Sequence, residues 1–169
     1  MLFRSGRTTV FTDPFVPYRN GIAALPMLLD SHRPMDLLVI MLGTNDTKAV
    51  FNIEVSTVAR GLRSLVEAAR GKGYGFDGRD PKILIISPAK IIAGDLNNPY
   101  FDARETTLAV AKSAQFASEY KAVAERMGCY FLDAAPVAEV SPIDGIHFTK
   151  KGHRDFGEWL VKEIAKLEF

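Results

Sequence analysis

The chain has 169 residues, of which 47% are hydrophobic and 24% charged, and its formal net charge is +1 at pH 7. These values fit a single globular domain over residues 1–169, large enough for a real hydrophobic core. With no long basic block, no nucleic-acid partner is indicated, and no apolar run reaches the roughly 18 residues of a membrane span.

A single cysteine, Cys129, excludes an internal disulfide. It lies beside an apolar segment, and we interpret it as a small buried hydrophobic residue. The N-terminus shows no extended apolar segment of the kind found in signal peptides. We therefore expect a protein of a reducing compartment, the cytoplasm.

The first elements are predicted from capping and apolar runs. Residues 1–19 have little periodicity and contain prolines that interrupt any helix or inner strand. Asn20 can cap a helix that reaches about His32. Residues 37–42 are all apolar, and the lack of alternation predicts an inner strand of a parallel sheet, covered on both faces.

Helices and strands alternate along the rest of the chain. Apolar residues at helical spacing predict helices at about 53–70, 103–127 and 150–167, and short apolar runs predict strands at 82–87 and 129–132. The glycine-rich segment 71–81 precedes a strand, so we interpret it as a flexible connection and not as a phosphate-binding loop. This alternation predicts an α/β fold with a parallel sheet.

Two loops follow predicted strands at their carboxyl ends, where open parallel sheets bind their ligands. The first is Gly43-Thr44-Asn45-Asp46, a candidate reaction site. The alternative is a strand-to-helix turn in which Asn45 or Asp46 caps the next helix. The second loop, residues 88–102, is either a substrate lid or a surface excursion.

Asp144 and His147 lie three residues apart, with Gly145 between them to tighten the turn. An acid that orients an imidazole is the usual support of a general base. Taken alone the signal is weak, because most pairs at this spacing are incidental. With His32 and His153 the pair shows no metal-binding spacing, and we expect neither a metal nor a cofactor.

Gly43-Thr44-Asn45-Asp46 and Asp144-Gly145-Ile146-His147 together resemble the third and fifth sequence blocks of the SGNH, or GDSL-type, hydrolases. The stretches 5–9, 39–48 and 84–88 resemble the arylesterase and acetylesterase branch of that family. The resemblance extends from about Ser5 to the last helix. It implies a flavodoxin-like three-layer sandwich and the hydrolysis of small-molecule esters by a Ser-His-Asp mechanism.

The same resemblance implies a role for each matching residue. His147 would be the general base, Asp144 its orienting acid, and Asn45 an oxyanion-hole donor through its side-chain amide. One such donor is worth about 3 kcal/mol in the transition state. Asp46 is expected to cap or organise the loop. To serve one reacting carbonyl, Asn45 and His147 should lie within about 10 Å of each other.

The sequence departs from the family at its N-terminus. It contains no Gly-Asp-Ser, the block that holds the nucleophile, and the oxyanion glycine of the second block would fall at Phe3. We therefore expect that an N-terminal strand–helix unit is absent, that no nucleophile lies in this chain, and that the chain alone is inactive. Ser87 is the best-placed substitute, but Pro88 leaves no helix N-terminus to activate it.

Other interpretations remain. A non-catalytic or truncated remnant of the family could act as a binding module, and loss of hydrolysis in the full-length gene product would favour it. A nucleotide or phosphoryl site would need a glycine-rich strand-to-helix loop, which the sequence lacks. A missing strand would leave an unpaired sheet edge, so we expect a marginal monomer or association with another copy or a companion segment.

Overall fold

The structure, a computed structural model, describes residues 6–94 and 103–168. Within these residues the sheet has three parallel strands in the order β1-β2-β3: β1 Leu37–Ile40, β2 Lys82–Ser87 and β3 Tyr130–Asp133. Residues 95–102, which include most of the candidate lid, lie outside the described residues, as does Phe3.

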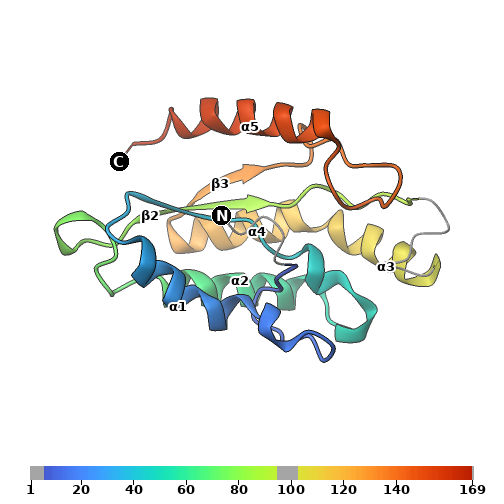
Figure 1. Cartoon of the computed structure of the whole chain (residues 1–169), viewed down its shortest axis with the longest axis horizontal. Helices are drawn as coiled ribbons and strands as arrows, with labels where there is room; N and C mark the ends of the chain where they lie inside the picture. The colour runs from blue at the N-terminus through green and yellow to red at the C-terminus, as the bar shows by residue number, and fades with distance from the viewer. Residues whose placement is uncertain (1–5, 95–102, 169) are drawn as a thin grey trace.

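The helices of the described residues lie on both sides of this sheet (Figure 1). They are α1 Gly21–His32, α2 Val55–Ala68, α3 Ala103–Ser113, α4 Phe116–Met127 and α5 Lys150–Ile164. Short 3-10 turns are η1 Pro17–Arg19, η2 Thr44–Thr47, η3 Ala49–Phe51 and η4 Phe76–Gly78. None of the helices in this part of the chain combines the length and apolar character needed to cross a bilayer.

The two faces of β2 build two separate parts of the core. Ile83 and Ile85 pack with α1, α2 and α4, whereas Leu84 and Ile86 belong to the cluster beneath α5. The alternation follows from strand geometry, in which successive side chains point to opposite faces. The result is the predicted α/β three-layer sandwich, with α5 on one side and α1 and α2 on the other (Figure 1).

The prediction that the first strand is an inner one is wrong for the described sheet, where this strand lies at the edge. β1 pairs with β2 along one edge, and no other described strand pairs with it. Val39, at its centre, is 40% exposed. The neighbouring residues are more covered, because Ile40 is 5% exposed and Leu37 and Leu38 pack against the core clusters on the two faces of the sheet.

The predicted helix at 103–127 is two helices, α3 and α4, which meet around residues 114–115. Ser113 is buried at the end of α3, where its hydroxyl donates to the carbonyl of Val110 and accepts the N–H of Ile91. A serine side chain that competes for backbone groups favours a helix end over a helix interior. Apolar periodicity alone does not reveal such a break.

The first helix begins as predicted, because the side chain of Asn20 accepts the N–H of Ala23. The glycine-rich connection is tied down by its own aspartate: the Asp80 carboxylate accepts the backbone N–H groups of Gly71, Lys72 and Gly73. Those amides, which a phosphate would need, are therefore already engaged.

Candidate active site

The loop that carries Asp144 and His147 connects β3 to α5. Its ends are joined by a bridge between Val140 and Phe148, and the N–H of Ser141 donates to the carbonyl of His147 at 2.7 Å. Gly145 has a φ of +70°, and a Cβ there would collide with the carbonyl oxygen of Ile92. Glycine therefore lets the loop turn tightly against the segment that leaves β2.

Asp144 holds His147 through both of its carboxylate oxygens. Oδ1 accepts the backbone N–H groups of Ile146 and His147, each at 2.9 Å, and Oδ2 lies 2.8 Å from Nδ1 of the imidazole. Partial burial would raise the pKa of Asp144, but these hydrogen bonds outweigh it and hold the pKa below its usual value. The carboxylate is thus ionised at neutral pH and fixes one ring nitrogen of His147.

His147 is presented to solvent at the start of the last helix, with 70% of its side chain exposed. Thr149 caps α5 by accepting the N–H of Gly152 at 2.8 Å, so a helix begins three residues after His147. The sequence-based pair is therefore assembled in space, and its ring is accessible to a reactant.

Asn45 lies in η2, just beyond the carboxyl end of β1. Its side-chain Nδ2 donates to the carbonyl of Arg7 at 3.3 Å, a long hydrogen bond. Gly43, which precedes η2, has a φ of +126° and packs against the hydroxyl of Tyr120 from α4. That hydroxyl donates to the carbonyl of Leu42 at 2.8 Å, so the turn is supported from beneath.

Asp46 does not cap the following helix, because α2 begins with Glu54 as its N-cap and has no side-chain cap. Instead the Asp46 carboxylate, fully buried, accepts the backbone N–H of Thr9 at 3.0 Å and its hydroxyl at 2.6 Å. Burial raises the pKa of Asp46 to about 6, although the bonds from Thr9 oppose this shift. Asp46 therefore organises the loop, and Thr9 is a partner that sequence patterns did not single out.

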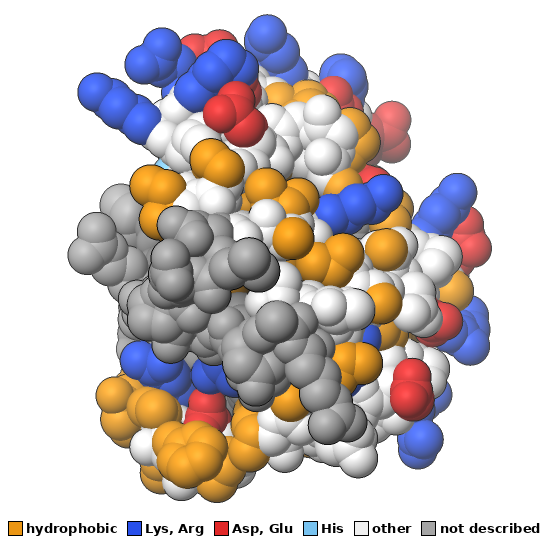
Figure 2. Space-filling view, turned by 90° about the vertical axis from the view of Figure 1, so that its right-hand side faces the viewer, with side chains coloured by type: hydrophobic (Ala, Val, Ile, Leu, Met, Phe, Trp, Pro, Cys, Tyr) orange, Lys and Arg blue, Asp and Glu red, His pale blue; other side chains and the backbone are white. Residues whose placement is uncertain are grey.

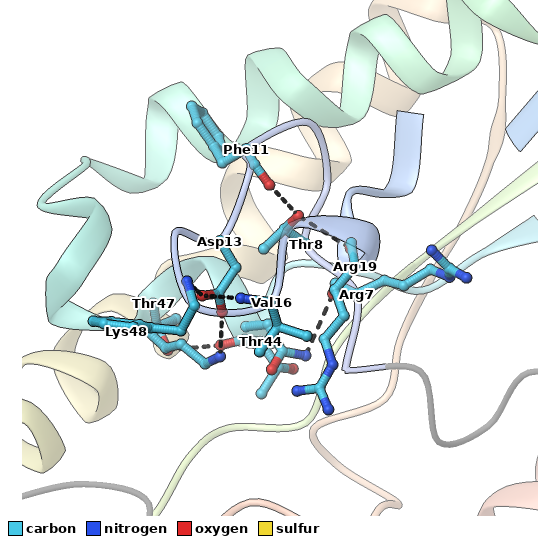
Figure 3. A network of polar contacts seen from close by, with 11 residues as sticks. Arg7, Thr8, Phe11, Asp13, Val16, Arg19, Thr44, Thr47 and Lys48 are labelled. Carbon is cyan, nitrogen blue, oxygen red and sulfur yellow. Dashed lines mark hydrogen bonds and ion pairs between the residues drawn. The ribbon is translucent and has the colours of Figure 1, made fainter. Parts of the chain in front are cut away.

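A second link joins the same two segments. Lys48, which follows η2, forms an ion pair of 2.9 Å with the buried carboxylate of Asp13, as Figure 3 shows. The hydrogen bond from Lys48 holds the pKa of Asp13 below its usual value. The loop after β1 is thus fixed to the irregular N-terminal segment by Asp46 and Lys48 together.

The structure brings Asp144 and His147 into contact and places Asn45 in a separate loop at the same edge of the sheet. The strands are parallel, and the N–H of Ile92, in the segment after β2, donates to the carbonyl of Gly145. Figure 2 looks onto this edge of the molecule. That Asn45 and His147 face one reactant remains a prediction.

Ser87, the substitute nucleophile weighed from the sequence, is fully buried at the end of β2. Its hydroxyl donates to Oδ1 of Asp133 at 2.7 Å. A nucleophilic serine needs a base within hydrogen-bond reach, and an approach for substrate. The Ser87 hydroxyl is thus bonded to a carboxylate of β3 and not to an imidazole, and its burial leaves no approach for substrate.

Comparison with known proteins was made on sequence and on structure. The family model described as GDSL-like lipase/acylhydrolase matches residues 4–154. A comparison with curated proteins found no match.

Three solved structures illustrate the similarity. An aryl esterase of M. smegmatis has 36% identity and a TM-score of 0.87, over 96% of this chain and 75% of that one. A carbohydrate acetylesterase of Sinorhizobium meliloti has 33% identity and a TM-score of 0.87, over the same shares of 96% and 75%. An acetylxylan esterase of Geobacillus stearothermophilus, at 20% identity and a TM-score of 0.59 over 86% of this chain and 66% of that one, shares the fold.

Proposed function

The chain belongs to the GDSL-like lipase/acylhydrolase family, and on this premise we propose that it cleaves acyl or acetyl esters of small molecules by a Ser-His-Asp mechanism. The observation that carries the proposal is the contact between Asp144 and His147 in the loop before α5. The relatives described as an aryl esterase and a carbohydrate acetylesterase support short acyl groups as the substrates.

In the proposed reaction His147 is the general base. Asp144 fixes Nδ1, which leaves Nε2 to take the proton of an attacking hydroxyl and later return it to the leaving alcohol. The ionised carboxylate also stabilises the imidazolium that forms in between. The large exposed fraction of the ring supports this role, because reactants must reach Nε2.

Asn45 is the proposed donor to the oxyanion of the tetrahedral intermediate. A side-chain amide carries two N–H groups, and in the described structure Arg7 accepts one of them. The Arg7 contact fixes the plane of the amide, and the second N–H is available to a substrate oxygen. A donor oriented before the reaction costs no reorganisation during it.

We propose that the nucleophilic serine lies outside the described residues. The best-placed serine of the described residues, Ser87, donates to Asp133 and is fully buried. The edge of β1 that faces away from β2 pairs with no described strand, which supports a serine carried at the end of an additional strand beside β1. A parallel strand added beside β1 would end at the level of Asn45 and would cover Val39.

Three further points belong to the proposal. The half-buried Cys129, whose pKa is raised by burial, behaves as a structural thiol and supports a reducing, cytoplasmic location. The edge of β1 supports association with another copy or a companion segment. No metal or cofactor takes part in the proposed mechanism.

A fluorophosphonate ester, which labels an activated serine covalently, tests the proposal. It would be applied to this chain and to a chain extended at its N-terminus by the coding sequence upstream of Met1. We expect no label on the present chain and stoichiometric label on the extended chain, at a serine before Met1. The extended chain should lose its labelling in His147→Ala and keep it in His32→Ala, the matched control on α1.

Three results would contradict the proposal. Stoichiometric labelling of Ser87, or full hydrolysis of a short-chain aryl ester by the present chain, would show that the nucleophile is misplaced. An extended chain that is neither labelled nor active would favour a binding module instead.

A further inference from the structure

The loop that contains Asn45 and Asp46 is hydrogen-bonded in both directions to the segment from Arg7 to Thr9, called here the Thr9 segment. From one side, the Asp46 carboxylate accepts the N–H and the hydroxyl of Thr9. From the other side, the carbonyl of Arg7 accepts the amide of Asn45. Asn45 and Asp46 are adjacent, and their partners Arg7 and Thr9 are only two residues apart. A shift of Thr9 would therefore also move the Arg7 carbonyl, which accepts the Asn45 amide.

Room for Thr9 is made by a glycine inside a helix. A Cβ at Gly61, in α2, would lie 2.6 Å from the Thr9 hydroxyl oxygen. Glycine in a helix interior costs about 1 kcal/mol relative to alanine. The glycine at this position removes the steric conflict and allows Thr9, which is fully buried, to reach Asp46.

Thr9 is also fixed along its backbone. Its carbonyl accepts the N–H of Ile22 in the first turn of α1 at 2.9 Å, and a Cβ at Gly21 would collide with the carbonyl oxygen of Thr8. The segment is therefore seated between α1 and α2, and its position does not depend on the long Asn45 hydrogen bond. The rigid partner is the Thr9 segment, and the Asn45 amide is oriented against it.

We propose that Thr9 and Asp46 are positioning residues that set the direction of the Asn45 amide through the carbonyl of Arg7. The inference rests on the proposed function only in treating Asn45 as the oxyanion donor. The buried carboxylate supports it, because an ion removed from water is retained only where its hydrogen bonds compensate the loss of hydration. A turn with no positioning role would need neither a buried carboxylate at Asp46 nor a glycine at position 61 to make room for Thr9.

Within residues 6–94 and 103–168, two titratable groups act on or respond to the charge of Asp46. Tyr120 approaches from α4, and its own pKa is raised well above the usual value by burial and by Asp46. Lys48, on the same loop, lowers the pKa of Asp46 less than the bonds from Thr9 do, and it is itself paired with Asp13. Thr9 contributes two neutral donors, its backbone N–H and its hydroxyl. Titration of Asp46 near pH 6 should therefore be felt first through Thr9 and Asn45.

The test follows the Asn45 side-chain amide by NMR in the full chain labelled with ¹⁵N-asparagine, between about pH 4.5 and pH 8. We expect its resonances to titrate with a midpoint near 6, the raised pKa of Asp46, while those of the exposed Asn52 do not. Thr9→Val should displace the amide resonances and raise the midpoint by about one unit, because one donor to the carboxylate is lost. Thr9→Ser should restore both.

Two controls make the outcome decisive. Thr57→Val, on α2, removes a hydroxyl that has no partner in the described structure and should leave the Asn45 amide unchanged. Asp46→Asn should abolish the titration. A titration that persists in Asp46→Asn, or an Asn45 amide that ignores Thr9→Val, overturns the proposal. The wild-type titration and Asp46→Asn suffice should Thr9→Val fail to fold.

The extended chain separates this inference from the proposed function. If it cleaves esters, Thr9→Val should lower kcat about tenfold at unchanged KM, and Thr9→Ser should recover it to within about twofold. If no form of the protein cleaves esters while the Asn45 amide still responds to Thr9→Val, the positioning inference stands and the proposed function fails. A kcat unchanged in Thr9→Val overturns the inference alone.

Discussion

Asp144 serves the backbone of its loop and the ring of His147 at the same time, one carboxylate oxygen for each. Oδ1 accepts the N–H groups of Ile146 and His147, and Oδ2 meets Nδ1 of the imidazole at 2.8 Å. The loop conformation and the orientation of the ring therefore both depend on the Asp144 side chain. Different substitutions of Asp144 can separate these two roles.

Asp144→Ala should open the loop, whereas Asp144→Asn should preserve it. Alanine leaves two backbone N–H groups without their acceptor, which we expect to cost about 1–2 kcal/mol in the free energy of unfolding. Asparagine keeps an oxygen for them but removes the charge. Hydrogen exchange at the Ile146 amide measures the difference, with Asp77→Ala, on an exposed turn, as the control. Equal protection in both variants would contradict this account.

Asp46→Asn should change how stability depends on pH. The folded-state pKa of Asp46 is raised from 3.8 to about 6, so the folded protein holds this proton more tightly than the unfolded chain. Its contribution to stability is full below the unfolded value and is lost as the pH rises through 6, by about 3 kcal/mol. Asparagine cannot ionise, so the free energy of unfolding of the variant should rise relative to that of the wild type between about pH 4 and pH 7.

Urea unfolding at several pH values measures that gain. Other acids with shifted pKa values, such as Asp13 and Asp144, are present in both proteins and cancel in the comparison. Parallel stability curves for wild type and variant would show that the carboxylate is not desolvated as its burial implies.

Gly61→Ala and Gly157→Ala should have opposite effects, although both glycines lie inside helices. At Gly61 a Cβ would sit 2.6 Å from the Thr9 hydroxyl, and we expect destabilisation by about 1–3 kcal/mol. At Gly157 nothing lies within 4 Å, so alanine should stabilise by up to about 1 kcal/mol. Thermal unfolding of the pair decides this, and a stabilising Gly61→Ala would disprove the close approach of Thr9.

Ser87→Ala should affect stability and not catalysis. The buried hydroxyl is lost from Asp133, whose Oδ1 still accepts the N–H of Ala135, so we expect a cost of about 1 kcal/mol. Ser113→Ala, which removes another buried and hydrogen-bonded hydroxyl, is the matched control for this loss of stability. Ester cleavage by the extended chain should stay within about twofold of wild type, and loss of labelling in Ser87→Ala would reverse the assignment.

Local patterns determined much of this protein. The run at β2 and the helical spacing in α2 and α5 predicted elements close to the observed ones, because periodicity reports which face of an element is covered. Asp144 and His147 could be paired from sequence, since three residues in one turn bring their side chains within reach. The motif around Asn45, taken together with the motif from Asp144 to His147, indicated the family from two short stretches of sequence.

Contacts between distant segments were decided only by the tertiary structure. The sequence gives no sign that Thr9 would meet Asp46, 37 positions away, or that Gly61 would open the space between them. The edge position of β1 depends equally on which strands are present to pair with it. Capping, turns and periodicity are properties of neighbouring residues, whereas a buried carboxylate and an unpaired strand edge depend on how separate elements pack.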